Sequence, residues 1–294
     1  MRRVRRLAAL AGLVALALLA AAGNAAWRDE ALPAEPPEAR LARLAPHWRL
    51  VRPEGPDPAP VAVLLSGCDG PGDNLDLWAA TLARLGWASL ALDSHAPRGL
   101  DRGAAWRLVC AGQALSGAER AGDAAVAIAA LEAMPGVDAR RVALVGASHG
   151  GWAAMELLAA LEPGAPPPPG LLAWPEPPEA TRARLRGAAL LYPYCGPLNE
   201  AVGRGPSPAG PPPLLMILAG EDTVTSAARC EAEARRLAAA GARVRAVTLE
   251  GAGHGFDQRE RSALSPLAFD PAATAEAQAR LARFLRALGS ESAS

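Results

Sequence analysis

Ser148 lies in a glycine-rich turn between a predicted strand and a predicted helix. Residues 142–145 form a short apolar run that is typical of a strand buried on both faces, and residues 152–161 have helical character. Between them, residues 146–150 fit the pattern G-x-S-x-G, which in this strand–turn–helix context indicates a nucleophile elbow. The turn also places the serine at a helix N-terminus, where the dipole and free N–H groups favour a developing oxyanion. The run therefore predicts a nucleophilic serine. The alternative is a glycine-rich turn that contains a serine by chance.

A serine hydroxyl is a poor nucleophile at neutral pH and needs a base, which in turn needs an orienting group. His254 is the only histidine that follows the serine motif, so it is the candidate base. Asp222 is the candidate acid, because it gives the chain order Ser, Asp, His and follows a predicted buried strand. Both residues should emerge at the carboxyl edge of the sheet, where Ser148 also lies. Glu221 and Asp257 are the alternative acids.

Two backbone N–H groups are candidates for an oxyanion hole. One belongs to His149, the residue after the predicted nucleophile, and the other to Cys68, in the loop that follows the predicted strand 61–65. Only the backbone of His149 is needed for this task, so its side chain receives no role.

Apolar runs alternate with amphipathic segments along most of the chain, which predicts an α/β fold with a doubly wound, mostly parallel sheet. The segment 164–178 is dense in proline and is predicted to be an exposed excursion. Only residues 193–213 separate two strands where a lid could be inserted, so we expect a short rim and no large cap domain. The predicted strands are 47–52, 61–65, 87–93, 142–145, 187–192, 214–219 and 242–249. The predicted helices are 75–85, 119–134, 152–161, 226–240 and 271–288.

The N-terminus resembles an export signal. Residues 1–6 are rich in arginine, residues 7–22 are apolar, and small residues follow at 20–26, as in a secretory signal peptide. We therefore expect a periplasmic or secreted protein. The alternative is an uncleaved segment, which would be the only membrane contact. The predicted division is a signal peptide or anchor at 1–26, an irregular arm at 27–46 and one domain at 47–294.

Composition narrows the class of protein further. The chain has 294 residues, of which 51% are hydrophobic, so it can bury one substantial core. Its formal net charge is +0, which argues against nucleic acid as a partner. The few histidines lack ligand-like spacing, so no metal is expected, and nothing implies a cofactor.

Four cysteines in an exported protein favour disulfides, and four cysteines allow three pairings. Cys68 and Cys110 both follow neighbouring predicted strands, as do Cys195 and Cys230. The prediction is that these neighbours pair, Cys68 with Cys110 and Cys195 with Cys230. A free, buried Cys68 thiol is the alternative.

In sum these motifs make the chain similar to the dienelactone hydrolase family of the α/β-hydrolase superfamily, over roughly residues 48–290. Two positions differ from the best-known members: Ser148 replaces a cysteine nucleophile, and Ser66 replaces a histidine that is common in related hydrolases. The resemblance therefore implies an esterase of broader scope than a dienelactone hydrolase. The motifs that carry it are residues 65–70, 93–99, 146–151, 220–222 and 253–256.

Few residues suggest how a substrate would bind. Arg98, after the second buried strand, could bind a substrate carboxylate in bidentate fashion, or it could tie its own loop to Asp93 or Asp101. Trp106, Trp152, Tyr192 and Tyr194 could line an apolar pocket or belong to the core.

The sequence therefore predicts an exported serine hydrolase that acts on a small-molecule ester through an acyl-enzyme. Two alternatives are a peptidase of the same fold and a non-catalytic envelope binding protein.

Overall fold

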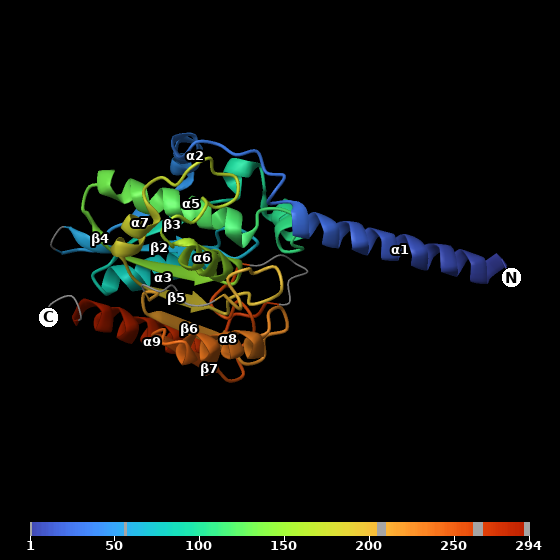
Figure 1. Ribbon diagram of the computed structural model, residues 1–294. Helices are drawn as coiled ribbons and strands as arrows, with labels where there is room; N and C mark the ends of the chain where they lie inside the picture. Colours follow the sequence, from blue (N-terminus) through green and yellow to red (C-terminus); the bar gives the residue numbers. More distant parts are fainter. Residues whose placement is uncertain (1, 56–57, 205–209, 261–266, 291–294) are drawn as a thin grey trace.

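The computed structural model describes residues 2–55, 58–204, 210–260 and 267–290 and contains one seven-stranded sheet (Figure 1). All seven predicted strands and all five predicted helices are present. The doubly wound α/β architecture expected from the sequence is therefore confirmed. The strands are β1 (Arg49–Val51), β2 (Ala59–Leu65), β3 (Ala88–Leu92), β4 (Val137–Ala147), β5 (Leu185–Leu191), β6 (Leu214–Ala219) and β7 (Val244–Leu249).

The strand order, β1-β3-β2-β4-β5-β6-β7, explains where a site can form. Only β1 runs antiparallel to its neighbour, while β2 to β7 are parallel. The chain builds outward from β2 first toward β3 and then, after crossing over, toward β4. The loops after β2 and β4 therefore diverge to opposite sides, and this switch point is where open α/β sheets bind ligands.

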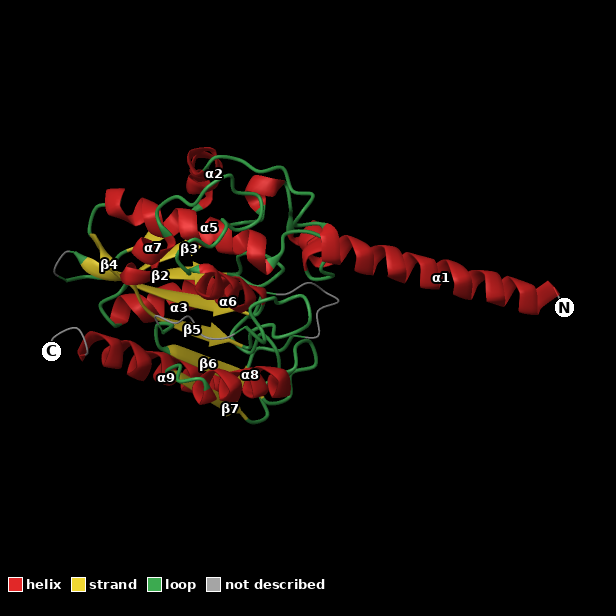
Figure 2. Ribbon diagram, viewed as in Figure 1, coloured by secondary structure: helices red, strands yellow, loops and turns green. Residues whose placement is uncertain are grey.

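Helices cover both faces of the sheet, which is why its strands are almost continuously apolar (Figure 2). On one face, Val61, Val63 and Leu65 of β2 pack in the same core as residues of α5, α6 and α8. On the other face, Ala62 and Leu64 share a core with α3 and α9. The main helices are α1 (Arg2–Trp27), α2 (Pro37–Leu44), α3 (Asp73–Arg84), α5 (Gly117–Ala130), α6 (His149–Ala160), α7 (Pro178–Arg184), α8 (Ala227–Ala239) and α9 (Pro271–Ser290).

The proline-rich segment 164–178 differs from the prediction, because its middle is packed against the domain. Leu171 is 5% exposed and pairs with Glu35 in an isolated parallel bridge. The buried guanidinium of Arg40, on α2, donates a hydrogen bond of 2.8 Å to the Gly170 carbonyl. The prediction of an exposed excursion was therefore wrong for these residues. The proline content indicated an irregular backbone. It could not show that a buried arginine would donate a hydrogen bond to a carbonyl group of that backbone.

The N-terminal helix α1 extends away from the domain (Figure 1). Its C-terminal end touches the loop around Gln113, whose side-chain amide donates to the Ala21 carbonyl over 3.2 Å. Asn24 in turn donates to the Gln113 carbonyl over 3.0 Å. Within the residues described, no helix combines the length and the apolar character that a bilayer crossing requires.

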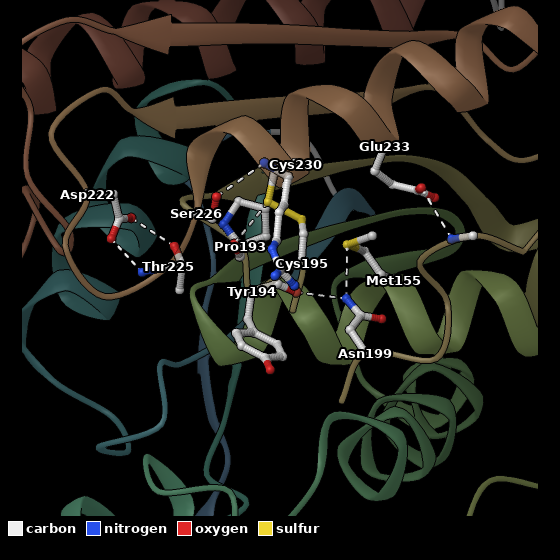
Figure 3. The surroundings of a disulfide bond; sticks show 12 residues. Met155, Pro193, Tyr194, Cys195, Asn199, Asp222, Thr225, Ser226, Cys230 and Glu233 are labelled. Atoms are coloured by element: carbon white, nitrogen blue, oxygen red, sulfur yellow. Dashed lines mark hydrogen bonds between the residues drawn. A yellow bond between two sulfur atoms is a disulfide. The ribbon is translucent and has the colours of Figure 1, made fainter. Parts of the chain in front are cut away.

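Both disulfides have the pairing expected from the sequence, Cys68–Cys110 and Cys195–Cys230. Each joins segments beyond the carboxyl ends of the strands. Figure 3 shows that Cys195–Cys230 ties the loop after β5 to α8, close to the turn that contains Asp222. The Cys230 sulfur also lies 3.2 Å from the Pro193 carbonyl oxygen.

Removing the second disulfide should destabilise the domain. The bond closes a loop of 35 residues in the unfolded chain, and loops of this length give about 2–4 kcal/mol. We expect Cys195→Ser combined with Cys230→Ser to lower the free energy of unfolding by about that amount, measured by urea denaturation under oxidising conditions. Unfolding curves that coincide with those of the unmodified protein would contradict this role.

Candidate active site

Ser148 occupies a strained turn between β4 and α6. Its backbone has φ 53° and ψ −113°, a conformation that costs a non-glycine residue on the order of 1–3 kcal/mol. The Ser148 N–H donates to the Leu191 carbonyl over 2.8 Å, which ties the turn to the end of β5. The predicted elbow geometry is therefore present, and it projects the hydroxyl beyond the edge of the sheet.

Glycines flanking the serine let three backbone segments meet. A Cβ atom on Gly150 would lie 2.2 Å from the Leu65 carbonyl oxygen of β2, and one on Gly146 would lie 2.4 Å from the Gly150 carbonyl oxygen. Neither contact can be relieved by rotating a side chain. The motif glycines are thus required by the close approach of β2, β4 and α6.

A chain of hydrogen bonds links the three predicted side chains. His254 Nε2 lies 2.9 Å from Ser148 Oγ, and His254 Nδ1 lies 2.7 Å from Asp222 Oδ2. A carboxylate can only accept, so Nδ1 carries the proton, which leaves Nε2 of the neutral ring free to accept from the hydroxyl. The Tyr192 ring supports this orientation by an edge contact with the imidazole, with centroids 4.7 Å apart.

The turn after β6 orients the Asp222 carboxylate. Its Oδ1 accepts from the N–H groups of Val224 and Thr225 at 2.8 and 2.7 Å, and its Oδ2 accepts from the Thr225 hydroxyl at 2.8 Å. Burial by itself raises the pKa of Asp222, but the hydrogen bond and charge of His254 and the two N–H groups outweigh it and hold the pKa below its usual value. Asp222 is therefore anionic when His254 becomes an imidazolium.

The two alternative acids lie elsewhere. Asp257 is fully buried and accepts from the Trp78 indole at 2.5 Å and from the Tyr192 hydroxyl. Burial raises the pKa of Asp257, although these two donors partly offset it. Glu221 is exposed on the surface. Geometry therefore selects Asp222 among the three carboxylates.

The Cys68 loop and Ser148 line a cavity of about 290 Å³. His149, which carries the other predicted N–H donor, follows Ser148 directly in the chain. His149 is the first residue of α6, where backbone N–H groups have no partner within the helix. Apolar walls come from Trp106, Val224 and Leu267. A volume near the lower end of ligand pockets suits a small substrate.

A buried arginine joins the two loops that carry these N–H groups. Arg120, on α5, is 0% exposed; its guanidinium donates to the Ser66 carbonyl at 2.9 Å and to His149 Nδ1 at 3.0 Å. Burial lowers the pKa of Arg120 to about 10, so it stays charged at neutral pH, with Asp123 as a nearby counter-charge. A guanidinium only donates, so His149 must accept through Nδ1. The side chain of His149, for which the sequence predicted no role, therefore has a structural role.

A second buried histidine holds the other half of the Cys68 loop. His95 Nε2 lies 3.0 Å from the Cys68 carbonyl oxygen and must donate, because a carbonyl only accepts. Burial, followed by the charge of Arg120, lowers the pKa of His95 to about 3, so the ring is neutral. Arg120 and His95 therefore fix the carbonyl groups of Ser66 and Cys68, on either side of Gly67, beside the serine.

The residues suggested for substrate binding lie outside the cavity. Arg98 forms ion pairs with Glu119 at 2.7 Å and Asp123 at 2.9 Å, both on α5. It neither reaches the site nor ties its loop to the aspartates expected from the sequence. The sequence pattern showed that Arg98 follows a strand. It could not show that folding brings the carboxylates of α5 within reach of the Arg98 side chain.

Two of the four candidate aromatic residues, Trp152 and Tyr194, pack behind the elbow. Trp152 donates to Glu156 Oε1 over 2.8 Å, and its ring lies 5.2 Å from that of Tyr194. Neither side chain borders the cavity, whereas the other two candidates, Trp106 and Tyr192, do line it.

Sequence reasoning also missed Asp69, Asn74 and Gln258, which form a polar side of the cavity. Asp69 belongs to the loop motif 65–70, which follows β2, whereas Gln258 belongs to the loop that contains His254. Only folding brings these two loops together, where the Gln258 amide donates to Asp69 over 2.9 Å.

Comparison with known proteins agrees with this geometry. The dienelactone hydrolase family model matches residues 179–289, which include Asp222 and His254. No curated protein matches the sequence. The predicted resemblance to the dienelactone hydrolase family is thus confirmed by the family model.

Solved structures share the fold at low sequence identity. Apo esterase 2 of Thermogutta terrifontis aligns with a TM-score of 0.58 and 22% identity, covering 82% of this chain and 89% of that chain. The dienelactone hydrolase-like promiscuous phosphotriesterase P91, from metagenomic libraries, aligns with a TM-score of 0.57 and 21% identity over 82% and 92% of the two chains. The chain therefore has the α/β-hydrolase fold.

The contact between Gly150 and β2 can be tested by adding one methyl group. We expect Gly150→Ala to lower the free energy of unfolding by about 1–3 kcal/mol or more, because the methyl overlaps the Leu65 carbonyl. Gly253→Ala is the control, since nothing lies within 4 Å of its Cβ position. Equal free energies of unfolding for the two variants, measured by chemical denaturation, would refute the steric argument.

Proposed function

We propose that the protein is an exported serine hydrolase that cleaves small carboxylic esters. The observation that carries the proposal is the hydrogen-bond chain from Ser148 Oγ through His254 to Asp222, with distances of 2.9 and 2.7 Å. This is the arrangement of nucleophile, base and orienting acid that acyl transfer requires. It lies beside a small cavity with mainly apolar walls, which fits a small acyl or alcohol group.

The reaction follows from the geometry. Ser148 Oγ attacks the ester carbonyl carbon while its proton passes to His254 Nε2, and the negative charge of Asp222 stabilises the resulting imidazolium. The N–H groups of Cys68 and His149 donate to the tetrahedral oxyanion. His254 then gives the proton to the leaving alkoxide. A water molecule, deprotonated by the same imidazole, hydrolyses the acyl-enzyme and restores the serine.

The compared proteins support this reaction class. Thermogutta terrifontis esterase 2 also has a structure phosphorylated by paraoxon, which matches this chain with a TM-score of 0.58 and 22% identity. A nucleophilic Ser148 would give this chain the same reactivity toward organophosphates.

Two features support export. The basic and apolar N-terminal segments have the order of a signal peptide, and both disulfides suit an oxidising compartment. We place the mature enzyme in the periplasm or outside the cell.

The nucleophile is tested by Ser148→Ala. We expect the variant to lose labelling by a fluorophosphonate probe and to lower kcat on p-nitrophenyl butyrate by roughly four to six orders of magnitude. Ser226→Ala is the control, because Ser226 is an exposed serine at the start of α8, and it should keep both signals. Failure of the unmodified protein to react with the probe would favour a binding protein. Labelling together with turnover of peptides but not esters would favour a peptidase.

The arginine bridge should matter for turnover more than for substrate binding. Lysine keeps the charge of Arg120 but cannot reach both Ser66 and His149, so we expect Arg120→Lys to lower kcat by roughly 10- to 100-fold with a smaller change in KM. Its thermal unfolding should be measured in parallel. An unchanged kcat in a folded Arg120→Lys variant would show that the bridge does not set the oxyanion geometry.

A further inference from the structure

The cavity beside Ser148 contains one carboxylate that the proposed reaction does not use. Asp69 lines the cavity one residue after Cys68. A Cβ atom placed on Gly67 would lie 3.1 Å from Asp69 Oδ1 and 3.9 Å from Ser148 Cβ, so the carboxylate and the nucleophile flank the same glycine. Any substrate positioned for attack by Ser148 must therefore lie in the field of this charge.

The hydrogen bonds of Asp69 leave part of the carboxylate available. Its Oδ2 accepts from the Gln258 amide at 2.9 Å, and the Gln258 amide is itself held by the Glu260 carbonyl at 2.6 Å. Within the described part of the chain, Oδ1 has no hydrogen-bond partner. The carboxylate is thus fixed at one oxygen and open at the other, as a binding group would be.

The rest of the lining offers nothing that would attract an anion. The described residues around the cavity include no arginine, and all 30 basic residues of the chain are arginines. Arg98 is paired with Glu119 and Asp123, and Arg120 is 0% exposed beneath the loops. Among the described residues that line the cavity, a carboxylate on the substrate would meet only the like charge of Asp69.

The aromatic wall favours a cation as well. Trp106 lines the cavity from a five-residue π-helix, Ala105–Val109, and helices of this rare type are frequent at functional sites. Indole rings attract cations through their π faces, and a carboxylate combined with aromatic walls is a common way to bind alkylammonium groups.

We propose that Asp69 is a specificity-determining residue and that the preferred substrates are small esters bearing a cationic alkylammonium group. This inference rests on the proposed esterase function and narrows its substrate class.

The test uses pairs of esters that differ in one atom. Butyrylcholine and 3,3-dimethylbutyl butyrate place N⁺ or C at the same position of the alcohol. The p-nitrophenyl esters of 4-(trimethylammonio)butanoate and 5,5-dimethylhexanoate do the same for the acyl group. In at least one pair we expect kcat/KM to be about tenfold or more higher for the cation, because a charge near Asp69 in a partly dry cavity is stabilised.

The variant Asp69→Asn keeps the shape of the side chain and removes its charge. The ratio of cationic to neutral kcat/KM should fall to about one in Asp69→Asn, whatever happens to either value alone. The matched control is Asp76→Asn, because Asp76 is an exposed acid on α3 that does not line the cavity. This variant changes the net charge equally and should keep the ratio.

The outcomes separate the two proposals. Hydrolysis of the neutral esters with no cationic preference in either pair would overturn the role of Asp69 and leave the esterase intact. A preference that persists in Asp69→Asn would also overturn it. Hydrolysis of none of the four esters, without fluorophosphonate labelling, would overturn the esterase function itself.

Discussion

A close approach of backbone segments, where β2, β4 and α6 meet, determines how the site is built. Gly146 and Gly150 allow this approach because a Cβ atom on either would overlap a peptide group. The consequence is a serine with φ 53°, held beyond the sheet edge by neighbouring strands. The strain of that turn is offset by the cores on both faces of the sheet, which bury β2 and β4 almost completely.

Around this contact, the topology brings together loops that are far apart in the chain. The strand order diverges between β2 and β4, so the Cys68 loop and the Ser148 turn leave neighbouring strands toward opposite faces of the sheet, which leaves room for a cavity. The acid and base follow β6 and β7 and reach the same edge. Beneath them, the charged Arg120 and the neutral His95 anchor the peptide groups beside the nucleophile. Because the hydrogen bonds of these two side chains are buried, water does not weaken them.

Elements with strong periodic patterns could be predicted from the sequence, since buried parallel strands are apolar runs and their flanking helices are amphipathic. Ser148, Asp222 and His254 could be named because each follows such a strand, and parallel strands end at one edge. Arg98 shows why other residues could not be assigned. Its position after β3 suggested substrate binding, but its partners lie on α5, 21 and 25 residues away. A charged side chain is satisfied by whichever opposite charge folding brings near.

The sequence by itself determined the α/β class, the elbow and the chain order of the proposed nucleophile, acid and base, because these depend on local patterns and on the parallel direction of the strands. Only the tertiary structure decided which carboxylate contacts His254, which side chains line the cavity and which charged side chains form internal ion pairs. Those choices depend on distances between residues separated by tens to hundreds of positions, as in the contact of Asp69 with Gln258. Such distances are set by packing of the whole domain, and no local pattern encodes them.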